Sequence, residues 1–450
     1  MSIVSGMTGV TRAAGSRRLR ARAAAALAAL ACLPCGAWQA PDAAEEETRT
    51  YAALNLVGAA VTMPPASDTM WGTRAAWRRA LARRGILFRV NSLPRVSVNL
   101  LDGPAAKGEQ AYIGHRPTWI TGLHPILTAD LRQLGLKGAQ LHVSGAWRWT
   151  TWKPAGPNAV TLATLHLYKE WGDGKVEMKA GYVLNDLEFL GLQVGGSLAV
   201  GAQGVYAVLP FQAGMSFFPF TAPSLNFRFQ LPRNFYVKTA VQRSLDAGGA
   251  IENARRNPSG FRFAPHGTRA LFIDEAGYRR AAGDGVRQVW VRAGMLYNTT
   301  RYVNRATLER ETGNGCFYVL GDVQLRQAGY GSPSRGMYAG ASWMSAPSRF
   351  NAYDRYFEAR VYQMGPFRSR AADTAALVYA WRSHSPVLTA RLAAEGKAFW
   401  QGSPSITASY NLRAGAGNYI TVALGFTRGA AITPRVKDAL VATVSWGMFF

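Results

Sequence analysis

The sequence predicts an all-β fold, an antiparallel transmembrane β-barrel, and three observations support this prediction. Apolar and polar residues alternate along many segments, short turns alternate with long connections, and the chain ends on an aromatic residue, Phe450. Alternation with a period of two is typical of half-buried strands, and in a membrane barrel the apolar face meets lipid while the polar face lines the lumen. The chain has 450 residues with 48% apolar residues and a mean hydropathy of −0.06, which excludes both a disordered chain and a bundle of apolar membrane helices.

The first 40 residues are expected to be a cleaved signal peptide. They contain five arginines and no acidic residue, then the Ala/Leu run 23–31, and then the small-residue site Ala37-Trp38-Gln39-Ala40. An amphipathic helix of a soluble protein is the alternative. Cleavage after Ala40 removes the five arginines and lowers the formal net charge from +25 to +20. The same cleavage removes Cys32 and Cys35 and leaves Cys316 as the single cysteine, so no internal disulfide is expected.

Residues 41–67 are expected to be a flexible N-terminal segment, and residues 68–85 an amphipathic helix. Asp68 is placed to cap this helix and Gly85 to end it, with tryptophans on its apolar side and arginines largely elsewhere. The helix would pack either on a soluble core or at the periplasmic end of a barrel. Residues 86–450 are then the barrel.

Tight turns join several of the alternating segments in pairs. They contain 172–174, 232–234, 283–285 and 415–418, which are rich in Gly, Asn, Asp and Pro. The connections between these pairs are longer and cover 183–222, 243–268 and 298–314. Short turns on one side and long loops on the other are the arrangement of outer-membrane barrels, whereas a β-sandwich mixes turn lengths.

The last strand alternates from Ala442 through Val444, Trp446 and Met448 to the terminal Phe450. Such an ending resembles the signal that the bacterial barrel-assembly machinery reads. We therefore expect that machinery as a partner, together with lipopolysaccharide and outer-membrane lipid around the barrel.

The connection 183–222 is expected to fold into the lumen. Residues 189–227 contain no charged side chain and are rich in Gly, Gln, Phe and Pro. Gly and Pro interrupt every apolar run, which argues against a membrane helix. A surface loop with one extra hairpin is the alternative. Long ordered loops in compact folds are usually functional, and an inward loop would narrow a pore.

Catalytic and metal-binding patterns are weak. The six histidines are scattered, and the chain contains no H-E-x-x-H, G-x-S-x-G or phosphate-binding loop. His142 and Ser144 share one face of a strand, but no orienting acid accompanies them. We therefore expect that the protein is not an enzyme and that it needs no cofactor or metal. A nucleic-acid partner is not expected either, since the basic residues are spread through the strands.

A lumen that passes polar solutes needs hydrogen-bond donors and acceptors, and aromatic faces suit solutes that contain a ring. The polar faces of the predicted strands, and the start of the inward loop, supply them. Each of these residues has an ordinary solvated wall position as its alternative. The candidate pore-lining residues are Asp130, Arg148, Lys175, Glu177, Lys179, Asp186, Glu188, Arg228, Tyr236, Lys238, Glu358 and Arg360, with Arg89, Glu170 and Tyr362 as further wall positions.

Asp186 and Glu188 begin the inward loop with two acceptors, which the cations of neighbouring strands are expected to face. The cations expected there are Arg148, Lys179, Arg228 and Lys238. Opposed charges across a narrow, water-filled gap would orient a neutral, hydroxyl-rich solute.

Several short motifs, taken in their order along residues 68–450, resemble the carbohydrate-selective porin family of the OprB type. They include Trp71-Gly72-Thr73-Arg74, Asn185-Asp186-Leu187-Glu188-Phe189, Phe218-Pro219-Phe220-Thr221-Ala222-Pro223-Ser224 and Asp274-Glu275-Ala276-Gly277-Tyr278. The resemblance implies a barrel of about 16 strands in the outer membrane. It also implies passive diffusion of monosaccharides such as glucose into the periplasm, without a cofactor or an energy source.

The expected net charge of +20 leaves an alternative open. The protein would then be a general or anion-preferring porin for small acidic solutes such as gluconate, because arginine forks suit carboxylates as well as hydroxyls. Part of the charge would face lipopolysaccharide phosphates instead. An outer-membrane barrel enzyme and an adhesin are further alternatives.

Overall fold

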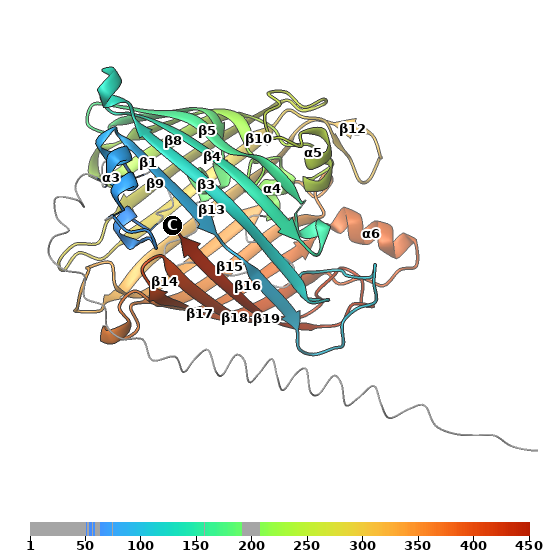
Figure 1. The fold of residues 1–450 in the computed structure, drawn as a ribbon. Coiled ribbons are helices and arrows are strands. Elements are labelled where there is room, and N and C mark those ends of the chain that lie inside the picture. Colours follow the sequence, from blue (N-terminus) through green and yellow to red (C-terminus); the bar gives the residue numbers. More distant parts are fainter. Residues whose placement is uncertain are drawn as a thin grey trace, which may run out of the picture.

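The protein forms a closed antiparallel β-barrel in a computed structural model (Figure 1). The structure describes residues 51, 54–55, 57–58, 64–73, 75–156, 158–190 and 208–450. The sheet has 17 strands, of which β1 (Ile86–Ser92) and β2 (Arg95–Asn99) share one position, because both pair with β3 and with β19. The wall therefore has 16 strand positions, which confirms the predicted fold class.

The other wall strands follow one another around the barrel, each antiparallel to its neighbours. They are β3 (Thr118–Asp130), β4 (Ala139–Thr150), β5 (Ala159–Trp171), β6 (Val176–Val183), β7 (Ala222–Gln230), β8 (Phe235–Arg243), β9 (Ala270–Arg280), β10 (Val289–Asn298), β13 (Asn314–Gln327), β14 (Gly336–Ser345), β15 (Tyr353–Met364), β16 (Thr374–His384), β17 (Gly402–Gly415), β18 (Asn418–Thr427) and β19 (Ala439–Phe449).

Strand β19 closes the barrel by pairing with β1 at Asn91 and with β2 at Val96. Pro94 lies between β1 and β2 and has no amide hydrogen to donate, which accounts for the break in the ladder. Its carbonyl still accepts the Trp446 amide at 2.9 Å, so β19 remains attached across the break.

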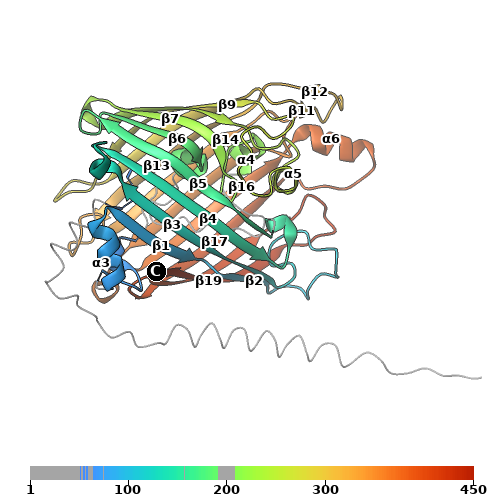
Figure 2. The same ribbon diagram turned by 45° about the horizontal axis from the view of Figure 1, so that its top comes forward.

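Turns and loops occupy opposite ends of the barrel, as the sequence predicts. The turn 172–174 has positive φ at all three residues, 59° at Gly172, 53° at Asp173 and 80° at Gly174, which suits the two glycines. The other end carries α5 (Ala250–Arg256), α6 (Pro386–Ala394) and the small hairpin of β11 (Tyr302–Val303) and β12 (Arg310–Glu311). Figure 2 shows these elements together, away from α3 (Ala76–Arg83). We call these the loop end and the turn end.

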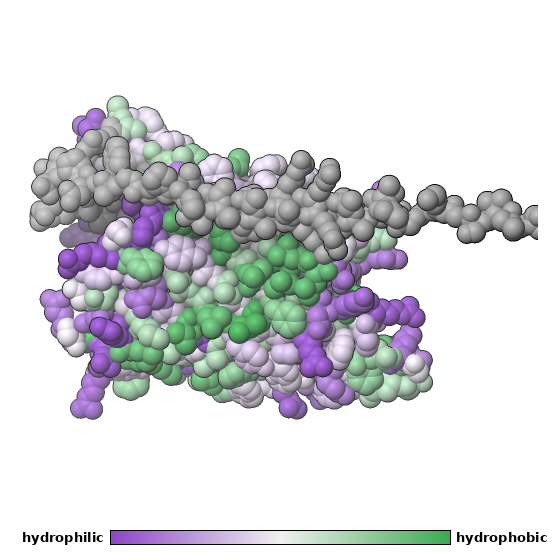
Figure 3. All heavy atoms as spheres, turned by 90° about the horizontal axis from the view of Figure 1, so that it is seen from below, coloured by the Kyte–Doolittle hydropathy of each residue, from purple (hydrophilic) through white to green (hydrophobic). Residues whose placement is uncertain are grey.

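The outward faces of the strands carry large apolar side chains. Trp119, Trp147, Phe229, Phe357 and Trp446 are each more than a third exposed, while the alternate positions of the same strands point inward. Figure 3 shows apolar residues gathered on one such face. An apolar band on the outside of a closed sheet is what a lipid environment requires. Within the described residues, no helix has the length and apolar character that crossing a membrane would require.

The N-terminal helix is shorter than the sequence predicts. It begins at Ala76, not at Asp68, and ends at Arg83. The carboxylate of Asp68 does not cap it, because it accepts hydrogen bonds from Arg413 at 2.5 Å and from the Tyr419 hydroxyl. The expected signal peptide 1–40 and most of the segment 41–67 lie outside the described residues.

Arg78 of this helix is fully buried. Its guanidinium donates to the Thr69 hydroxyl and to the Gly72 carbonyl, both at 2.6 Å. Trp71 packs beside Phe450 with ring centroids 5.5 Å apart. The segment before the helix is therefore attached to the C-terminal strand at the turn end.

Candidate functional site

The connection between β6 and β7 enters the barrel and packs on its inner wall. Its described parts are 184–190, which includes a single π-helical turn (Asp186–Leu190), and 208–221, which includes α4 (Val208–Gln212). Buried apolar residues of both parts form one cluster with the inner faces of β8 to β15. The loop contributes Phe189, Leu190, Leu209, Ala213 and Met215, and the wall contributes residues such as Leu271, Ile273, Leu296, Leu320 and Met344. The predicted inward loop is thus confirmed for its described parts, and residues 191–207 lie outside them.

Asn185 fixes the point at which the loop leaves β6. Its side chain is fully buried and donates to Ser224 at 3.0 Å and to Gln242 at 2.7 Å. Its carbonyl oxygen accepts from Asn226 at 2.7 Å. Buried amides that satisfy each other across neighbouring strands hold a segment in one position, because any shift would leave a polar group without a partner.

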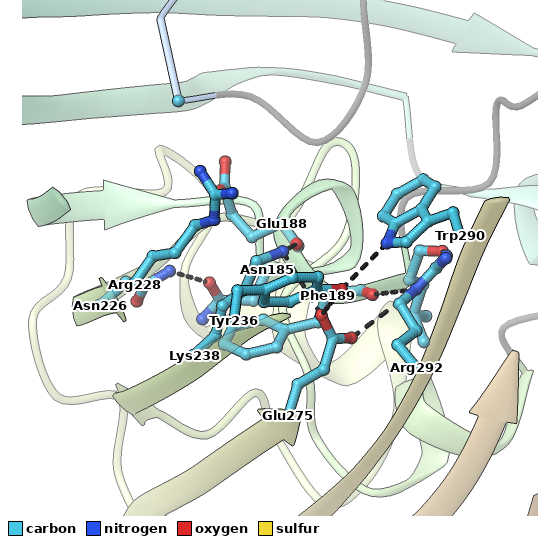
Figure 4. A network of polar contacts seen from close by, with 12 residues as sticks. Asn185, Glu188, Phe189, Asn226, Arg228, Tyr236, Lys238, Glu275, Trp290 and Arg292 are labelled. Carbon is cyan, nitrogen blue, oxygen red and sulfur yellow. Dashed lines mark hydrogen bonds and ion pairs between the residues drawn. The ribbon is translucent and has the colours of Figure 1, made fainter. Parts of the chain in front are cut away.

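Beyond Asn185, the loop meets a group of charged side chains from β6, β8, β9 and β10. Figure 4 shows Glu188 of the loop near Lys238, Glu275 and Arg292 of the wall. We call this group the loop-facing cluster, and its members are Lys179, Glu188, Tyr236, Lys238, Glu275 and Arg292. Lys179 forms an ion pair with Glu188 at 2.6 Å. Lys238 donates to the main-chain carbonyl of Glu188 at 2.5 Å and lies 3.5 Å from the carboxylate of Glu275.

Glu275 is the centre of the cluster and is fully buried. It accepts from the hydroxyls of Tyr236 and Tyr318, each at 2.9 Å, and pairs with Arg292 at 3.7 Å. Arg292 also donates to the main-chain carbonyls of Phe189 and Leu190. The wall cations therefore hold the loop through its backbone as well as through the Glu188 side chain.

Arg228 and Glu177 form a separate pair beside this cluster, at 2.5 Å. The Arg228 guanidinium also lies 5.4 Å from the centre of the Tyr236 ring. The two groups share a small cavity of about 20 Å³, bordered also by Gly58, whose carbonyl accepts from Lys179 at 3.0 Å. A cavity of this size has room for about one water molecule.

A second charged group lies on β13, β14 and β15, and we call it the wall cluster. Arg360 donates to Asp322 at 2.6 and 2.8 Å, and to Glu358 and Ser342 at 2.7 Å each. A Cβ on Gly340 would lie 2.3 Å from the carboxylate of Asp322, so only glycine fits beneath this pair. The Tyr356 and Tyr362 hydroxyls complete it by donating to Glu358 and to Asp322.

The structure brings together some of the sequence-predicted site residues and separates others. Lys179, Glu188, Tyr236 and Lys238 share the loop-facing cluster, with Glu177 and Arg228 beside it, while Glu358 and Arg360 belong to the wall cluster. Arg228 was expected to face the loop carboxylates and instead pairs with Glu177 of the neighbouring strand. The reason is register, since Glu177 and Arg228 lie directly opposite each other on β6 and β7.

Three candidates lie elsewhere. Asp130 ends β3 at the turn end, where it pairs with the exposed Arg132 at 2.5 Å. Lys175 is exposed in the turn before β6. Arg148 does not face the loop carboxylates as expected, because its position near the end of β4 places its guanidinium against Gly156 in the connection to β5. Alternation alone puts all three on polar faces but does not give their height along the barrel axis.

Among the described residues, Asp186 forms no ion pair with a cation, contrary to the expectation. Burial, followed by the nearby charge of Glu188, raises the pKa of Asp186 to about 7, against opposing hydrogen bonds from the Leu187 and Phe218 amides. Its Oδ1 is buried without a partner. Burial therefore favours the protonated form of Asp186, whereas Glu188 has a lysine partner.

Sequence reasoning did not select Glu275, Arg292 or Asp322. The inward face of β9 reads Leu271, Ile273, Glu275, so its first two inward residues are as apolar as an outward face. Leu271 and Ile273 face the lumen, where the inward loop packs on them. The alternation signal is lost where both faces of a strand are covered by apolar groups. In the described part of the chain, no group of three or more His, Cys, Asp or Glu side chains is arranged to hold a metal ion.

Comparison with known proteins gives two kinds of match. The OprB of Pseudomonas putida, in its high-pH structure, covers 85% of this chain and 98% of its own, at 15% identity and a TM-score of 0.69. Its low-pH structure gives a TM-score of 0.55 at 14% identity, covering 86% of this chain and 100% of its own. OmpF of Salmonella typhi, in complex with daunomycin, gives 0.51 at 10% identity, covering 82% and 99%.

These structural matches show the shared barrel fold. A search of curated protein sequences found no match. The family model described as carbohydrate-selective porin, OprB family, matches residues 137–413, which hold β4 to most of β17 and both charged clusters. This chain therefore belongs to the carbohydrate-selective porins of the OprB family, which are barrels of the bacterial outer membrane.

Proposed function

We propose that this porin admits monosaccharides such as glucose by passive diffusion into the periplasm, and that the loop-facing cluster is its selective element. Family membership supports a carbohydrate as the solute. The observation that carries the residue assignment is that Glu188, on the inward loop, pairs with Lys179 at 2.6 Å beside Lys238 and Glu275 of the wall.

Paired charges suit a neutral solute with many hydroxyl groups. Each hydroxyl both donates and accepts, so it can replace water at a cation and at a carboxylate in turn. The loop-facing cluster has three cations and two carboxylates, so its net charge is small. A small net charge limits the attraction of simple ions, whereas closely spaced donors and acceptors favour sugars.

A porin that prefers acidic solutes such as gluconate is a second candidate. The observation in its favour is the formal net charge of +25, or +20 after the expected cleavage. This excess is spread over the molecule and not concentrated at the loop-facing cluster. A charged surface raises the local concentration of anions, and this effect weakens with added salt.

Swelling of liposomes that contain the purified barrel tests both candidates. We expect glucose to enter faster than an amino acid of similar mass. Lys179→Gln should slow glucose entry several-fold, because it removes the partner of Glu188. Lys175→Gln is the matched control, since it removes the same charge from an exposed turn residue nearby and should leave the rate unchanged.

Other outcomes have clear meanings. Entry rates set only by mass would remove the carbohydrate preference and leave a general porin. Faster entry of gluconate than of glucose would promote the anion-preferring candidate. Equal effects of the two lysine changes would show that the cluster is not the selective element.

We further propose that the chain is exported by its signal peptide and inserted by the barrel-assembly machinery through β19. Phe450 supports this role, because its amide donates to the Val90 carbonyl at 2.9 Å and its ring packs on Trp71 at the turn end. Phe450→Ala should reduce the amount of heat-modifiable barrel in outer-membrane fractions. Unchanged assembly of this variant would argue against the signal.

A further inference from the structure

A cavity of about 520 Å³ lies at the loop end, outside the transport site described above. It is formed by the connection after β8, the connection that holds β11 and β12, Phe350 and α6. Figure 2 shows α5, β11, β12 and α6 gathered at this end. Cavities of this volume commonly accept a small-molecule ligand the size of a sugar.

The lining of the cavity is strongly basic. Its arginines come from α5, from the connection 299–313 and from α6, and they are Arg256, Arg301, Arg305, Arg310 and Arg391. The acidic residues of the lining are Asp246 and Glu252. Five guanidinium groups thus face two carboxylates around one cavity.

Both carboxylates are already engaged by one arginine. Arg256 lies 3.2 Å from Asp246 and 2.5 Å from Glu252, and the exposed Arg255 also pairs with Glu252. Arg391 pairs with Glu395 at 3.0 Å. Among the described residues, Arg301, Arg305 and Arg310 form no ion pair with a carboxylate.

Arg305 is held in place beside the cavity. Its Nε donates to the Phe350 carbonyl at 3.3 Å, and its amide donates to the Arg349 carbonyl at 2.7 Å. Burial lowers the pKa of Arg305, and the neighbouring charge of Arg391 lowers it further. Glu395 offsets part of the charge of Arg391, whereas Arg305 has no ion pair with a described carboxylate, so a bound anion would become the partner of Arg305 and reduce its repulsion with Arg391.

The same cavity has an aromatic side. Tyr302 and Phe350 lie next to each other with ring centroids 6.1 Å apart, and both border the cavity. Leu308 and Leu388 add apolar surface. Arginine forks recognise carboxylate and phosphate groups in a bidentate manner, while apolar and aromatic surface accommodates the ring of a ligand.

We propose that this cavity is a binding site for a saccharide that carries a carboxylate or a phosphate group, at the extracellular mouth of the porin. The proposal rests on the proposed function only in that the bound sugar lies on the route to the pore. The same chemistry occurs in free sugar acids and sugar phosphates, and in the phosphorylated sugars of lipopolysaccharide.

Calorimetric titration of the full, folded barrel in detergent, freed of lipopolysaccharide, tests the proposal with glucuronate, glucose 6-phosphate and glucose. We expect both anions to bind, and glucose to bind about tenfold more weakly or not at all. Arg305→Gln should weaken binding of the anions about tenfold, which is the usual effect of losing one hydrogen bond to a charged group. Arg435→Gln is the matched control, because Arg435 is exposed on another loop at the same end and does not line the cavity.

Arg310→Gln provides a second variant if Arg305→Gln fails to fold, because Arg310 is exposed. Competition by added lipopolysaccharide would assign the natural ligand to its phosphorylated sugars, and its absence would assign it to free sugar anions. Equal affinity for glucose, equal losses in Arg305→Gln and Arg435→Gln, or no anion binding at all would overturn the proposal. Glucose entry into liposomes with Arg305→Gln should remain normal, which separates failure of this site from failure of the pore.

Discussion

The loop-facing cluster and the wall cluster have similar composition but are built in different ways. In the wall cluster, Arg360 bridges Asp322 and Glu358, and every partner comes from three consecutive strands. In the loop-facing cluster, Lys238 and Arg292 reach main-chain carbonyls of the inward loop, about 50 and 100 residues away in sequence. The first arrangement joins strands of the barrel wall to one another, and the second joins the wall to the segment that we propose to select solutes.

Removing the carboxylate of Glu275 should give the largest effect and disrupt the loop-facing cluster. Glu275→Ala leaves Lys238 and Arg292 near each other without their shared buried carboxylate. Removing one partner of a buried ion pair lowers the free energy of unfolding by about 3–5 kcal/mol. Urea unfolding in detergent, followed by the gel shift of heat-modifiable barrels, measures the loss. Glu275→Gln is the control and should lose less, and a loss below about 1 kcal/mol for Glu275→Ala would contradict the central role of Glu275.

Breaking the wall cluster should lower stability without altering transport. Arg360→Met leaves Asp322 and Glu358 as unpaired buried carboxylates, which costs about 3 kcal/mol. Single-channel conductance and the relative rates for sugars should match the wild type, since Arg360 donates its hydrogen bonds to residues of the wall strands β13, β14 and β15. Altered sugar rates in a folded Arg360→Met barrel would show that the two clusters are not independent.

Exchanging the charges of Lys179 and Glu188 should sharpen the comparison further. Lys179→Glu alone places two carboxylates about 3 Å apart and should shift ion selectivity and release the start of the loop. Adding Glu188→Lys restores the pair, and the coupling between the two changes is expected to be about 1–2 kcal/mol. Conductance and reversal potential in planar bilayers measure both variants, and the absence of any recovery in the double variant would exclude a direct pair.

Acidification should have the smallest effect, and it acts only on the loop. The pKa of Asp186 in the folded protein is about 7, above its ordinary value of 3.8, so the folded state binds this proton more tightly. The stabilising contribution is therefore complete below about pH 4 and is lost as the pH rises through 7. The loop should be held more firmly at pH 5 than at pH 8, with larger protection factors of the loop amides once each exchange rate is divided by the intrinsic rate at the same pH.

Asp186→Asn mimics the protonated carboxyl and should remove this pH dependence. Asp130→Asn is the matched control, because it changes the same residue type at the turn end, outside the loop. A pH dependence that persists in Asp186→Asn would assign it to another group.

Much of the barrel could be predicted from local patterns. Residues 405–413 and 419–427 alternate with a period of two, and the structure places them in β17 and β18, paired in antiparallel register. The Gly-rich turns likewise predicted the order of turns and loops, and the terminal Phe450 marked the last strand. The predicted start of the N-terminal helix was wrong, because the Asp68 carboxylate accepts hydrogen bonds from Arg413 and Tyr419, more than 340 residues away, and does not cap the helix.

The sequence by itself predicted most of the strands and the polar and apolar faces of those that alternate, and it favoured entry of the uncharged loop into the lumen, because these follow from periodicity and composition within short windows. Only the tertiary structure decided which charged side chains meet. Glu275 meets Lys238 and Arg292 because β9 pairs with β8 and with β10. Lys238 reaches the Glu188 carbonyl because the loop packs on Leu271 and Ile273 of β9. An apolar patch on an inner wall is stable only when another segment covers it, because the hydrophobic effect comes from removing apolar surface from water. The patch therefore cannot be interpreted from the sequence of its own strand.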